Sequence, residues 1–491
     1  MNKNDIVQLH IDDIGTDGEG IGRVNGFTVF VKDAAVGDEI TAKIMKVKKN
    51  YAYARLESIV NPSVYRVTPV CPVAAKCGGC QIQHIKYSEQ LNIKTKKVLD
   101  SLTRIGGIDK EILKKVYEGI IGMDEPFHFR NKAQYPVQMG KDGTVKLGFY
   151  AYHSHNIIEN DECMIEQPVC AELLKEVRKL ISRFNVTPYN EETGTGALRH
   201  VLIRTGFVTK EIMICFVANL NDKESKKWLN SEYLKTEFPE SLQKAAIKYG
   251  FNFSSLCVNI NTTKTNVIMG DKTYTLYGNP YICDYIGDIK FQIHAKSFFQ
   301  VNPVQTRKLY EKVLSYAAPE GNETVWDLYS GIGTISLFLA QKAKHVVSVE
   351  IVPEAIKNAI ENAKINGITN VTFKCGAAEN IVPKLNQELT SRENEAFPCD
   401  TAVVDPPRAG CDAVLLETLI KMNPKKIVYV SCDPATLARD LKYLLGNGYM
   451  LAKVCAVDQF GHSMHVETCV LLTKSSVSAD LAISNPNPQF A

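Results

Sequence analysis

The sequence predicts an α/β protein whose C-terminal part is a Rossmann-like, doubly wound sheet, preceded by a small β-barrel and a mixed α+β region. From about Phe291, short apolar runs alternate with helical stretches, the pattern of a parallel sheet covered by helices. The first 60 residues are instead short strands separated by Gly-Asp turns, the pattern of a small barrel. We expect a barrel over 1–60, a central domain over 61–290, a C-terminal domain over 291–474 and a disordered tail over 475–491.

The composition is that of a globular protein, with 45% apolar and 23% charged residues. The first residues, Met1 to Leu9, lack the apolar stretch of a secretory signal, and no run of 18 apolar residues could span a membrane. We therefore expect a cytoplasmic protein. Its 14 cysteines should then be core thiols, metal ligands or a nucleophile rather than disulfides. A net charge of +3 neither requires nor excludes a polyanionic partner.

The expected barrel runs from Ile6 to about Val60 and ends in a basic stretch that contains two tyrosines. Basic side chains can neutralise phosphates, and tyrosine rings offer faces on which bases stack. The stretch contains Lys43, Lys46, Lys48, Lys49, Tyr51, Tyr53 and Arg55. An edge strand protected by lysines would have the same composition. The barrel therefore indicates nucleic-acid contact and a solvated edge about equally.

Three cysteines lie close together after the barrel. Cys71, Cys77 and Cys80 have the spacing of metal ligands, and a fourth ligand would come from Cys163 or, by position, its rival Cys170. The spacing fits zinc and an iron–sulfur cluster almost equally well. Unligated thiols are the less favoured interpretation, because a Gly-Gly loop buries little sulfur.

Five short apolar runs of the C-terminal part are expected to be the strands of the parallel sheet. These runs are TVWDL, HVVSVE, NVTFKC, TAVVD and KIVYVS. Helical periodicity separates them, most clearly over Pro353 to Ile365, where proline marks a helix start. One face of that helix should carry Ile356, Ala359, Ile360 and Ala363.

The turn after the first of these strands indicates a cofactor site. Gly331 and Gly333 allow a tight strand-to-helix turn and a close approach of the backbone to a ligand. A nicotinamide enzyme would want a third glycine where Ser336 stands. Glu350 closes the second strand, where it can accept hydrogen bonds from both hydroxyls of a ribose. The pattern suits an adenosyl ligand, although a packing role for the glycines is about equally compatible with it.

The fourth strand is followed by a rigid loop. Asp405-Pro-Pro-Arg408 fixes the backbone at the carboxyl edge of the sheet, where ligands of open α/β sheets bind. Simple strand termination would also explain two prolines. Together with the glycine turn, however, the loop favours a ligand site.

Cys432 follows the fifth strand and therefore belongs to the same edge. Most free cysteines are small buried hydrophobes, but this one precedes a helix that begins near Pro434, and a helix N-terminus favours a thiolate. Glu467 begins an apolar strand, and burial would raise its affinity for protons towards the range useful for a base. A salt bridge at the start of the strand is the alternative for Glu467. Cys469 is expected to be core.

These motifs together resemble the RNA uracil-C5-methyltransferase family from end to end apart from the tail. The barrel resembles a TRAM domain, an oligonucleotide-binding module. The other stretches that carry the resemblance are CPVAAKCGGCQIQH, DECMIEQP, SFFQVNP, DLYSGIGT, VVSVE, VVDPPR, VSCDPATLARDL and HVETCVLL. The resemblance implies an S-adenosylmethionine-dependent transferase domain that packs against the helical stretch from Tyr87 to Gly122.

The resemblance also implies roles for individual residues. Cys432 would be the nucleophile that adds to carbon 6 of uracil, and Glu467 the general base that removes the proton from carbon 5. S-adenosylmethionine would be bound by Gln300, Tyr329, Glu350 and Asp405 beside the turn of Gly331 and Gly333. A [4Fe-4S] cluster would be held by Cys71, Cys77, Cys80 and Cys163.

Two positions depart from the family pattern. Asp433 stands where asparagine is usual, and its charge would raise the pKa of the neighbouring thiol unless the carboxylate caps the following helix. Gly461 stands where proline is common, which would loosen that loop.

The resemblance implies RNA as the partner, and 23S rRNA as the substrate, because family members with both barrel and cluster resemble the ribosomal branch. The T-loop of tRNA is the alternative. Two remoter alternatives are an adenine amino-methyltransferase, which would need no cysteine, and a non-catalytic RNA-binding factor. The target uridine should lie in a loop or bulge, since it must leave its stack to reach Cys432.

Overall fold

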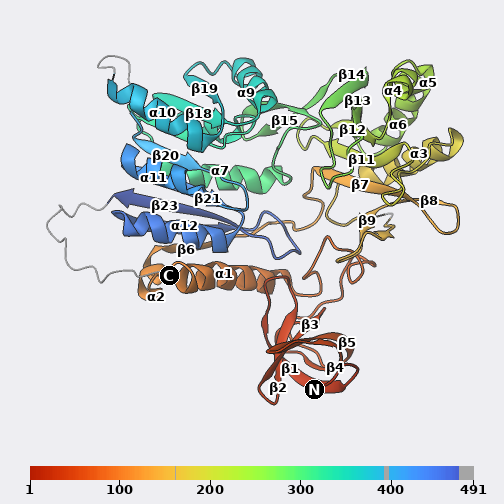
Figure 1. Cartoon of the computed structure of the whole chain (residues 1–491), viewed down its shortest axis with the longest axis horizontal. Coiled ribbons are helices and arrows are strands. Elements are labelled where there is room, and N and C mark those ends of the chain that lie inside the picture. The colour runs from red at the N-terminus through yellow and green to blue at the C-terminus, as the bar shows by residue number, and fades with distance from the viewer. Residues whose placement is uncertain (161, 392–397, 475–491) are drawn as a thin grey trace.

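The computed structural model describes residues 1–160, 162–391 and 398–474, with side chains omitted over 386–391. The tail expected to be disordered, 475–491, lies outside the described residues. Figure 1 shows a barrel, a central region and a large layered domain. No helix in the described ranges has the length and apolar character needed to cross a membrane.

The N-terminal strands form a closed barrel in the order β1-β2-β3-β5-β4. The strands are β1 (Ile6–Ile14), β2 (Gly20–Val24), β3 (Phe27–Lys32), β4 (Glu39–Val47) and β5 (Tyr51–Asn61). Alternate residues such as Val29, Val31 and Ile40 fill the interior, as the two-residue period of a strand requires. The expected barrel is confirmed.

The central region is built on a six-stranded sheet in the order β14-β13-β12-β11-β7-β8. Its strands are β7 (Lys132–Met139), β8 (Val145–Leu147), β11 (Leu198–Thr205), β12 (Glu211–Ala218), β13 (Asn252–Ile260) and β14 (Lys272–Gly278). Helices α3 (Val169–Arg183) and α6 (Glu237–Ile247) pack against the sheet in one apolar core, next to α4 (Asp222–Leu229) and α5 (Glu232–Lys235). Two very short strands, β9 (Phe149–Tyr150) and β10 (Ile157–Ile158), pair at its border.

A hairpin of β15 (Tyr281–Ile286) and β16 (Ile289–His294) joins the central sheet to the C-terminal domain. Its apolar residues share a core both with central-sheet residues such as Met213 and with residues of the second sheet such as Val325. The expected boundary between residues 290 and 291 falls inside β16.

The C-terminal domain contains an eight-stranded sheet in the order β19-β18-β17-β20-β21-β23-β22-β6. Its strands are β17 (Thr324–Leu328), β18 (His345–Glu350), β19 (Val371–Cys375), β20 (Thr401–Val404), β21 (Lys426–Ser431), β22 (Tyr449–Val457), β23 (Glu467–Lys474) and β6 (Tyr117–Ile121). The helices around it are α7 (Pro303–Ala317), α8 (Thr334–Ala340), α9 (Pro353–Ile365), α10 (Ala378–Ser391), α11 (Ala413–Met422) and α12 (Pro434–Gly446).

The five expected strands are present and parallel, but the sheet as a whole is mixed. Strand β23 runs antiparallel to both β21 and β22. The predicted parallel strands are confirmed, and the structure adds an antiparallel strand at this edge. The physical reason is the connection from Val457 to Glu467, which is too short for the crossover that a parallel neighbour requires.

Helix α9 begins and ends where the sequence predicts, yet its buried face is rotated. Ile356, Ala359 and Ala363 are buried, whereas Ile360 is 46% exposed, which corrects the predicted face. Asn362 is buried instead. Its amide donates to the carbonyl of Ile332 (3.2 Å), and its side-chain oxygen accepts from the amide of Gln292 in β16 (2.8 Å). These hydrogen bonds rotate the helix so that Asn362 faces the interior and Ile360 faces solvent.

A segment far away in sequence completes the C-terminal domain. Helix α1 (Tyr87–Arg104) packs against α12, α2 (Lys110–Val116) packs against β22, and β6 pairs in parallel with β22 at the edge of the sheet. Val98, Leu102 and Leu113 belong to the same apolar core as Leu437 and Tyr429. Figure 1 shows α1 and β6 beside α12 and β23.

Candidate active site at the carboxyl edge of the sheet

A pocket of about 410 Å³ opens at the carboxyl ends of the central parallel strands. The strand order reverses at β17, which has β18 on one side and β20 on the other, and such a reversal leaves a crevice for ligands. The pocket is lined by the predicted residues Gln300, Tyr329, Gly331, Glu350, Asp405, Cys432 and Glu467. Gly333 lies next to the pocket rather than in its lining.

The antiparallel direction of β23 explains how Glu467 reaches this edge. Asp405 and Cys432 directly follow the parallel strands β20 and β21, and Glu350 is the last residue of β18. Glu467 is the first residue of β23, so its amino end meets their carboxyl ends.

The turn from β17 to α8 has three residues in the left-handed backbone region, Tyr329, Gly331 and Gly333, with φ of 70°, 58° and 84°. A Cβ at Gly331 would meet nothing within 4 Å, whereas one at Gly333 would lie 3.2 Å from the Cβ of Ala359 in α9. The two glycines therefore differ. Gly331 leaves open space at the pocket, and Gly333 is needed for close packing of α9, the alternative that the sequence left open.

The carboxylate of Glu350 is held in a fixed position by two backbone groups. The amide of Gly331 donates to one oxygen (2.9 Å) and the amide of Val352 donates to the other (2.8 Å). A carboxylate oxygen can accept more than one hydrogen bond. Glu350 is therefore fixed and still able to accept bonds from a pair of hydroxyls.

Two acids of the pocket, the half-buried Asp405 and the buried Glu467, have no ionic partner among the described residues. Burial raises the pKa of Asp405 to about 7. Burial, and then the charge of Asp405, raises the pKa of Glu467 to about 8, although Arg408 opposes the shift. Neither acid forms an ion pair with the described residues, so the salt bridge considered for Glu467 is absent there. Perturbed, unpaired acids of this kind in a cleft are typical of catalytic sites.

The thiol of Cys432 is protonated in the free protein at neutral pH. Its pKa is raised to about 11, first by burial and then by the carboxylates of Glu467 and Asp405, while Arg408 acts in the opposite direction. Burial and the two carboxylates therefore outweigh any stabilisation of the thiolate by the following helix in the free protein. Asp433 is not among the causes of this shift: its carboxylate caps α12 by accepting from the backbone amides of Ala435 (2.8 Å) and Thr436 (3.3 Å).

The loop between β22 and β23 forms one wall of the pocket, and α1 holds it in place. Lys94 is completely buried and donates to Asp458 (2.5 Å) and to the carbonyl of Phe460 (2.9 Å). Tyr87 donates to the other oxygen of Asp458 (2.8 Å). The loop is therefore not loosened by Gly461, which is buried against Phe129 and Met123.

Comparisons with known proteins place the chain in a family. A sequence model described as tRNA (uracil-5-)-methyltransferase matches residues 270–475, and a TRAM-domain model matches residues 2–56. An RNA methyltransferase of Clostridium tetani is 47% identical over 96% of this chain and 97% of its own length. One from Bacillus cereus is 46% identical over 96% and 98%. The chain belongs to the tRNA (uracil-5-)-methyltransferase family.

A solved structure extends the likeness to three dimensions. The tRNA (uracil-54, C5)-methyltransferase of Pyrococcus abyssi, in complex with S-adenosyl-L-homocysteine, is 27% identical with a TM-score of 0.72. The match covers 95% of this chain and all of that one. The present methyltransferase therefore uses S-adenosylmethionine and acts on RNA.

The pocket of this methyltransferase also contains residues to which the sequence gave no role. They are Phe298, Tyr310, Arg408, Phe460 and His465. Phe298 is 69% exposed, which is unusual for a phenylalanine and places an aromatic face at the pocket. Burial lowers the pKa of His465 to about 4, so this imidazole is neutral. The Pro-Pro-Arg motif was a signal for Arg408, but isolated aromatic residues gave none.

The cysteine motifs of the methyltransferase come together in space. Charges on Cys71 and Cys77 raise the pKa of Cys80, after burial, to about 12, and charges on Cys80 and Cys77 act likewise on Cys163. Cys170, the rival for the fourth position, lies in the apolar core of α3. Within the described ranges, no three Cys, His, Asp or Glu side chains are close enough to hold a single metal ion.

Proposed function

We propose that this methyltransferase forms 5-methyluridine in 23S rRNA through a covalent bond between Cys432 and carbon 6 of the target uracil. The observation that carries the proposal is one pocket shared by a thiol, an unpaired acid of pKa about 8 and a fixed carboxylate on a glycine turn. A thiol and a base in one site are what methylation of a poorly nucleophilic carbon requires.

The reaction follows from the placement of Cys432 and Glu467. Cys432 loses its proton to solvent, its thiolate sulfur adds to carbon 6, and the electron pair of the ring double bond becomes available at carbon 5. Carbon 5 would then accept the methyl group, with S-adenosylhomocysteine as the leaving group. Glu467 then removes the proton from carbon 5, and the sulfur leaves carbon 6 as the double bond reforms. When bound, S-adenosylmethionine supplies the methyl group and a positive sulfonium charge, which would lower the pKa of a neighbouring thiol.

The cofactor contacts are proposed for the residues around the glycine turn. Glu350 would accept hydrogen bonds from the ribose hydroxyls, and Asp405 would face the positively charged end of the cofactor. Gln300 and Tyr329 line the same pocket, and Gly331 leaves room for the ligand there. Gly333 would act indirectly, by allowing α9 to pack closely behind the turn.

We further propose a [4Fe-4S] cluster on Cys71, Cys77, Cys80 and Cys163. The donor set supports it: the four thiols come from two segments, and Cys80 and Cys163 pack against the same small apolar cluster. Cysteines that bind different irons need not converge as tightly as the ligands of one zinc ion. The cluster would be structural, since no step above needs an electron.

The test of the reaction is labelling with tritiated S-adenosylmethionine. The wild type should label unmodified 23S rRNA, Cys432→Ala should label none, and Glu467→Gln should form an RNA–protein adduct that survives a denaturing gel. Cys375→Ala, at an exposed cysteine outside the pocket, is the matched control and should retain activity. Full activity of Cys432→Ala would instead support amino-methylation of adenine, and failure to bind S-adenosylmethionine in calorimetry would support a non-catalytic RNA-binding factor.

The T-loop of tRNA is the second candidate substrate, and the likeness to the Pyrococcus abyssi tRNA enzyme favours it. The proposal of rRNA rests on the combination of barrel and cysteine motifs. Unmodified transcripts of 23S rRNA and of tRNA, offered separately and in competition, decide between them. Labelling of tRNA alone would overturn the rRNA assignment and leave the chemistry intact.

A further inference from the structure

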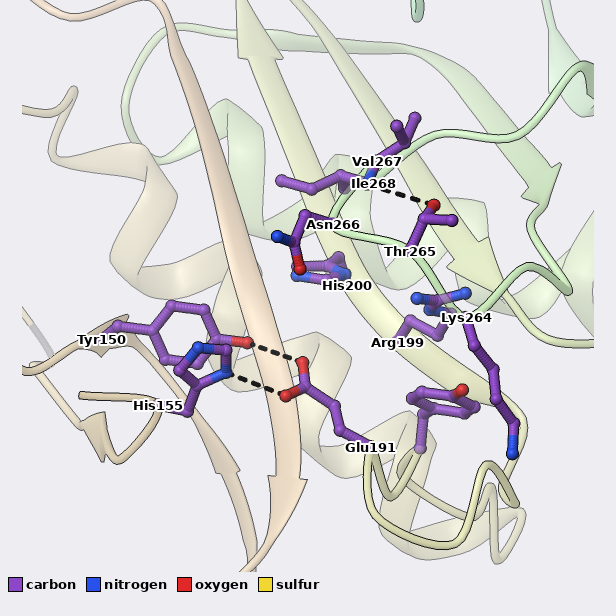
Figure 2. Close-up of a pocket in the computed structure, with 11 residues that line it drawn as sticks. Tyr150, His155, Glu191, Arg199, His200, Lys264, Thr265, Asn266, Val267 and Ile268 are labelled. Atoms are coloured by element: carbon purple, nitrogen blue, oxygen red, sulfur yellow. Dashed lines mark hydrogen bonds and ion pairs between the residues drawn. The ribbon is translucent and has the colours of Figure 1, made fainter. Parts of the chain in front are cut away.

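The central domain contains a second pocket, of about 390 Å³, that belongs to no part of the proposed active site. Its floor consists of Arg199 and His200 from β11. Its walls come from three separate segments: residues 150–155, 189–191 and 264–268. Figure 2 shows Tyr150, His155 and Glu191 on one side and the 264–268 segment on the other.

The floor of this pocket holds buried polar atoms without partners. Arg199 is 7% and His200 8% exposed. The guanidinium of Arg199 donates to the carbonyls of Asn261 (3.1 Å) and Thr263 (2.6 Å) and lies 4.5 Å from the ring centre of Tyr189. Its Nε and the Nδ1 of His200 have no hydrogen-bond partner among the described residues. Because an unpaired buried polar atom is costly, these two atoms point to a ligand that supplies partners.

The walls offer groups suited to a nucleobase. The rings of Tyr150 and His155 lie 5.2 Å apart, and both donate to the carboxylate of Glu191, at 3.4 Å and 2.8 Å. Aromatic faces can stack on a base, and the amide of Asn266 can pair with a base edge. Glu191 would repel a phosphate inside the pocket, whereas exposed Lys264 can contact one at the rim.

The pocket is continuous with a surface that leads to the barrel. Tyr150 and His155 also line a shallow depression that extends over residues 149–155 to Gly78 and Gly79. There, Lys32 of β3 lies 5.1 Å from the ring centre of Tyr152 and donates to the carbonyl of Ala75 (2.6 Å). One RNA strand could therefore contact the barrel and the second pocket together.

We propose that this pocket binds one unpaired nucleotide of the RNA substrate. Its base would stack on Tyr150 and form a hydrogen bond with His200, and its phosphate would lie near Lys264. The inference rests on the proposed action on RNA, but not on the identity of the methylated base. The nucleotide here is a second contact point, distinct from the target uridine at Cys432. Its role is to fix how a folded RNA lies on the enzyme.

The first test is RNA affinity of the full-length enzyme with unmodified transcripts of 23S rRNA and tRNA. Tyr150→Ala should weaken binding of whichever unmodified transcript is the enzyme's substrate by roughly 5- to 100-fold, the effect of losing one stacked base. Lys264→Ala should reduce the slope of log affinity against log salt by roughly one. Tyr274→Ala, at an exposed tyrosine of β14 outside every pocket described above, is the control and should bind as the wild type does.

The second test is independent of folding defects caused by Tyr150→Ala. Asn266→Ala alters an exposed side chain and should also weaken RNA binding, while calorimetry shows unchanged binding of S-adenosylhomocysteine. Transcripts carrying 4-thiouridine should crosslink to peptides that contain residues 150–155 or 264–268. If the wild type methylates RNA but Tyr150→Ala and Asn266→Ala bind it like Tyr274→Ala, the pocket is not a nucleotide site. If the wild type methylates no RNA, the proposed function fails instead.

Discussion

On the α1 side of the loop 458–466, Lys94 and Asp458 form a buried ion pair. On its pocket side, the half-buried Asp405 and the buried Glu467 have no such partner among the residues that the structure describes. Both arrangements remove charge from water, which is costly. In the Lys94–Asp458 pair, the opposite charge and further hydrogen bonds offset the loss of hydration. Asp405 and Glu467 have no such opposite charge, so their pKa values rise and they hold protons near neutral pH. The contrast separates groups that hold the site together from groups kept available for chemistry.

The largest expected effect on stability comes from removing the buried Lys94–Asp458 ion pair. Lys94→Met leaves Asp458 buried without its cation and should lower the free energy of unfolding by about 3–5 kcal/mol, measured by urea denaturation. Lys96→Met on the same helix is the matched control, because Lys96 is exposed and pairs with Asp13 and Asp100 at the surface. That variant should lose at most about 1 kcal/mol. Equal losses in the two variants would contradict the distinction.

Replacing the unpaired acid Glu467 should raise, not lower, the free energy of unfolding at high pH. The pKa of Glu467 is raised from 4.5 to about 8 on folding, so between these values the folded chain holds a proton that the unfolded chain releases. Its contribution to stability therefore falls as the pH rises through this window. Glu467→Gln has no proton to lose, and it should be more stable than the wild type at pH 9 by a few kcal/mol, at about 1.4 kcal/mol per pKa unit.

Thermal midpoints of wild type and Glu467→Gln at pH 5 and pH 9 measure this effect. The difference should be large at pH 9 and small at pH 5. Glu354→Gln, at an exposed glutamate of α9, should show no such pH dependence. A Glu467→Gln variant that is less stable than the wild type at pH 9 would show that the acid is structurally paired.

The smallest effect concerns the carboxylate beside the nucleophile. Asp433→Ala removes the cap of α12 and should cost about 1 kcal/mol of unfolding free energy. Asp433→Asn keeps a capping oxygen and should change stability by only a few tenths of a kcal/mol. Because the raised pKa of Cys432 is caused by burial, Glu467 and Asp405, the asparagine variant should also keep its methylation rate. A large rate change in Asp433→Asn would place Asp433 among the groups that tune the thiol.

Local patterns predicted the elements and the edge at which the site lies. The bounds of α9 and the position of Cys432 after a strand followed from periodicity and turn chemistry, which depend on neighbouring residues. The buried Lys94–Asp458 pair joins positions 364 residues apart, and no local pattern reveals it. For the same reason the raised pKa of the Cys432 thiol was not predicted, since Asp405 follows another strand and Glu467 begins a third. The exposure of Ile360 depends on the hydrogen bond that Asn362 accepts from the backbone amide of Gln292 in a distant hairpin.

Strand β6 has a consequence for biosynthesis. Ile121 pairs with Val457, more than 300 residues later, so on a ribosome adding roughly 5–20 residues per second β6 waits on the order of tens of seconds for its partner. Barrel and central sheet can fold in that interval, but the transferase domain cannot be completed. A fragment beginning at residue 291 would leave β22 with an open edge, which invites aggregation. Nascent-chain proteolysis should accordingly find the transferase domain protected only after its last strand has left the exit tunnel.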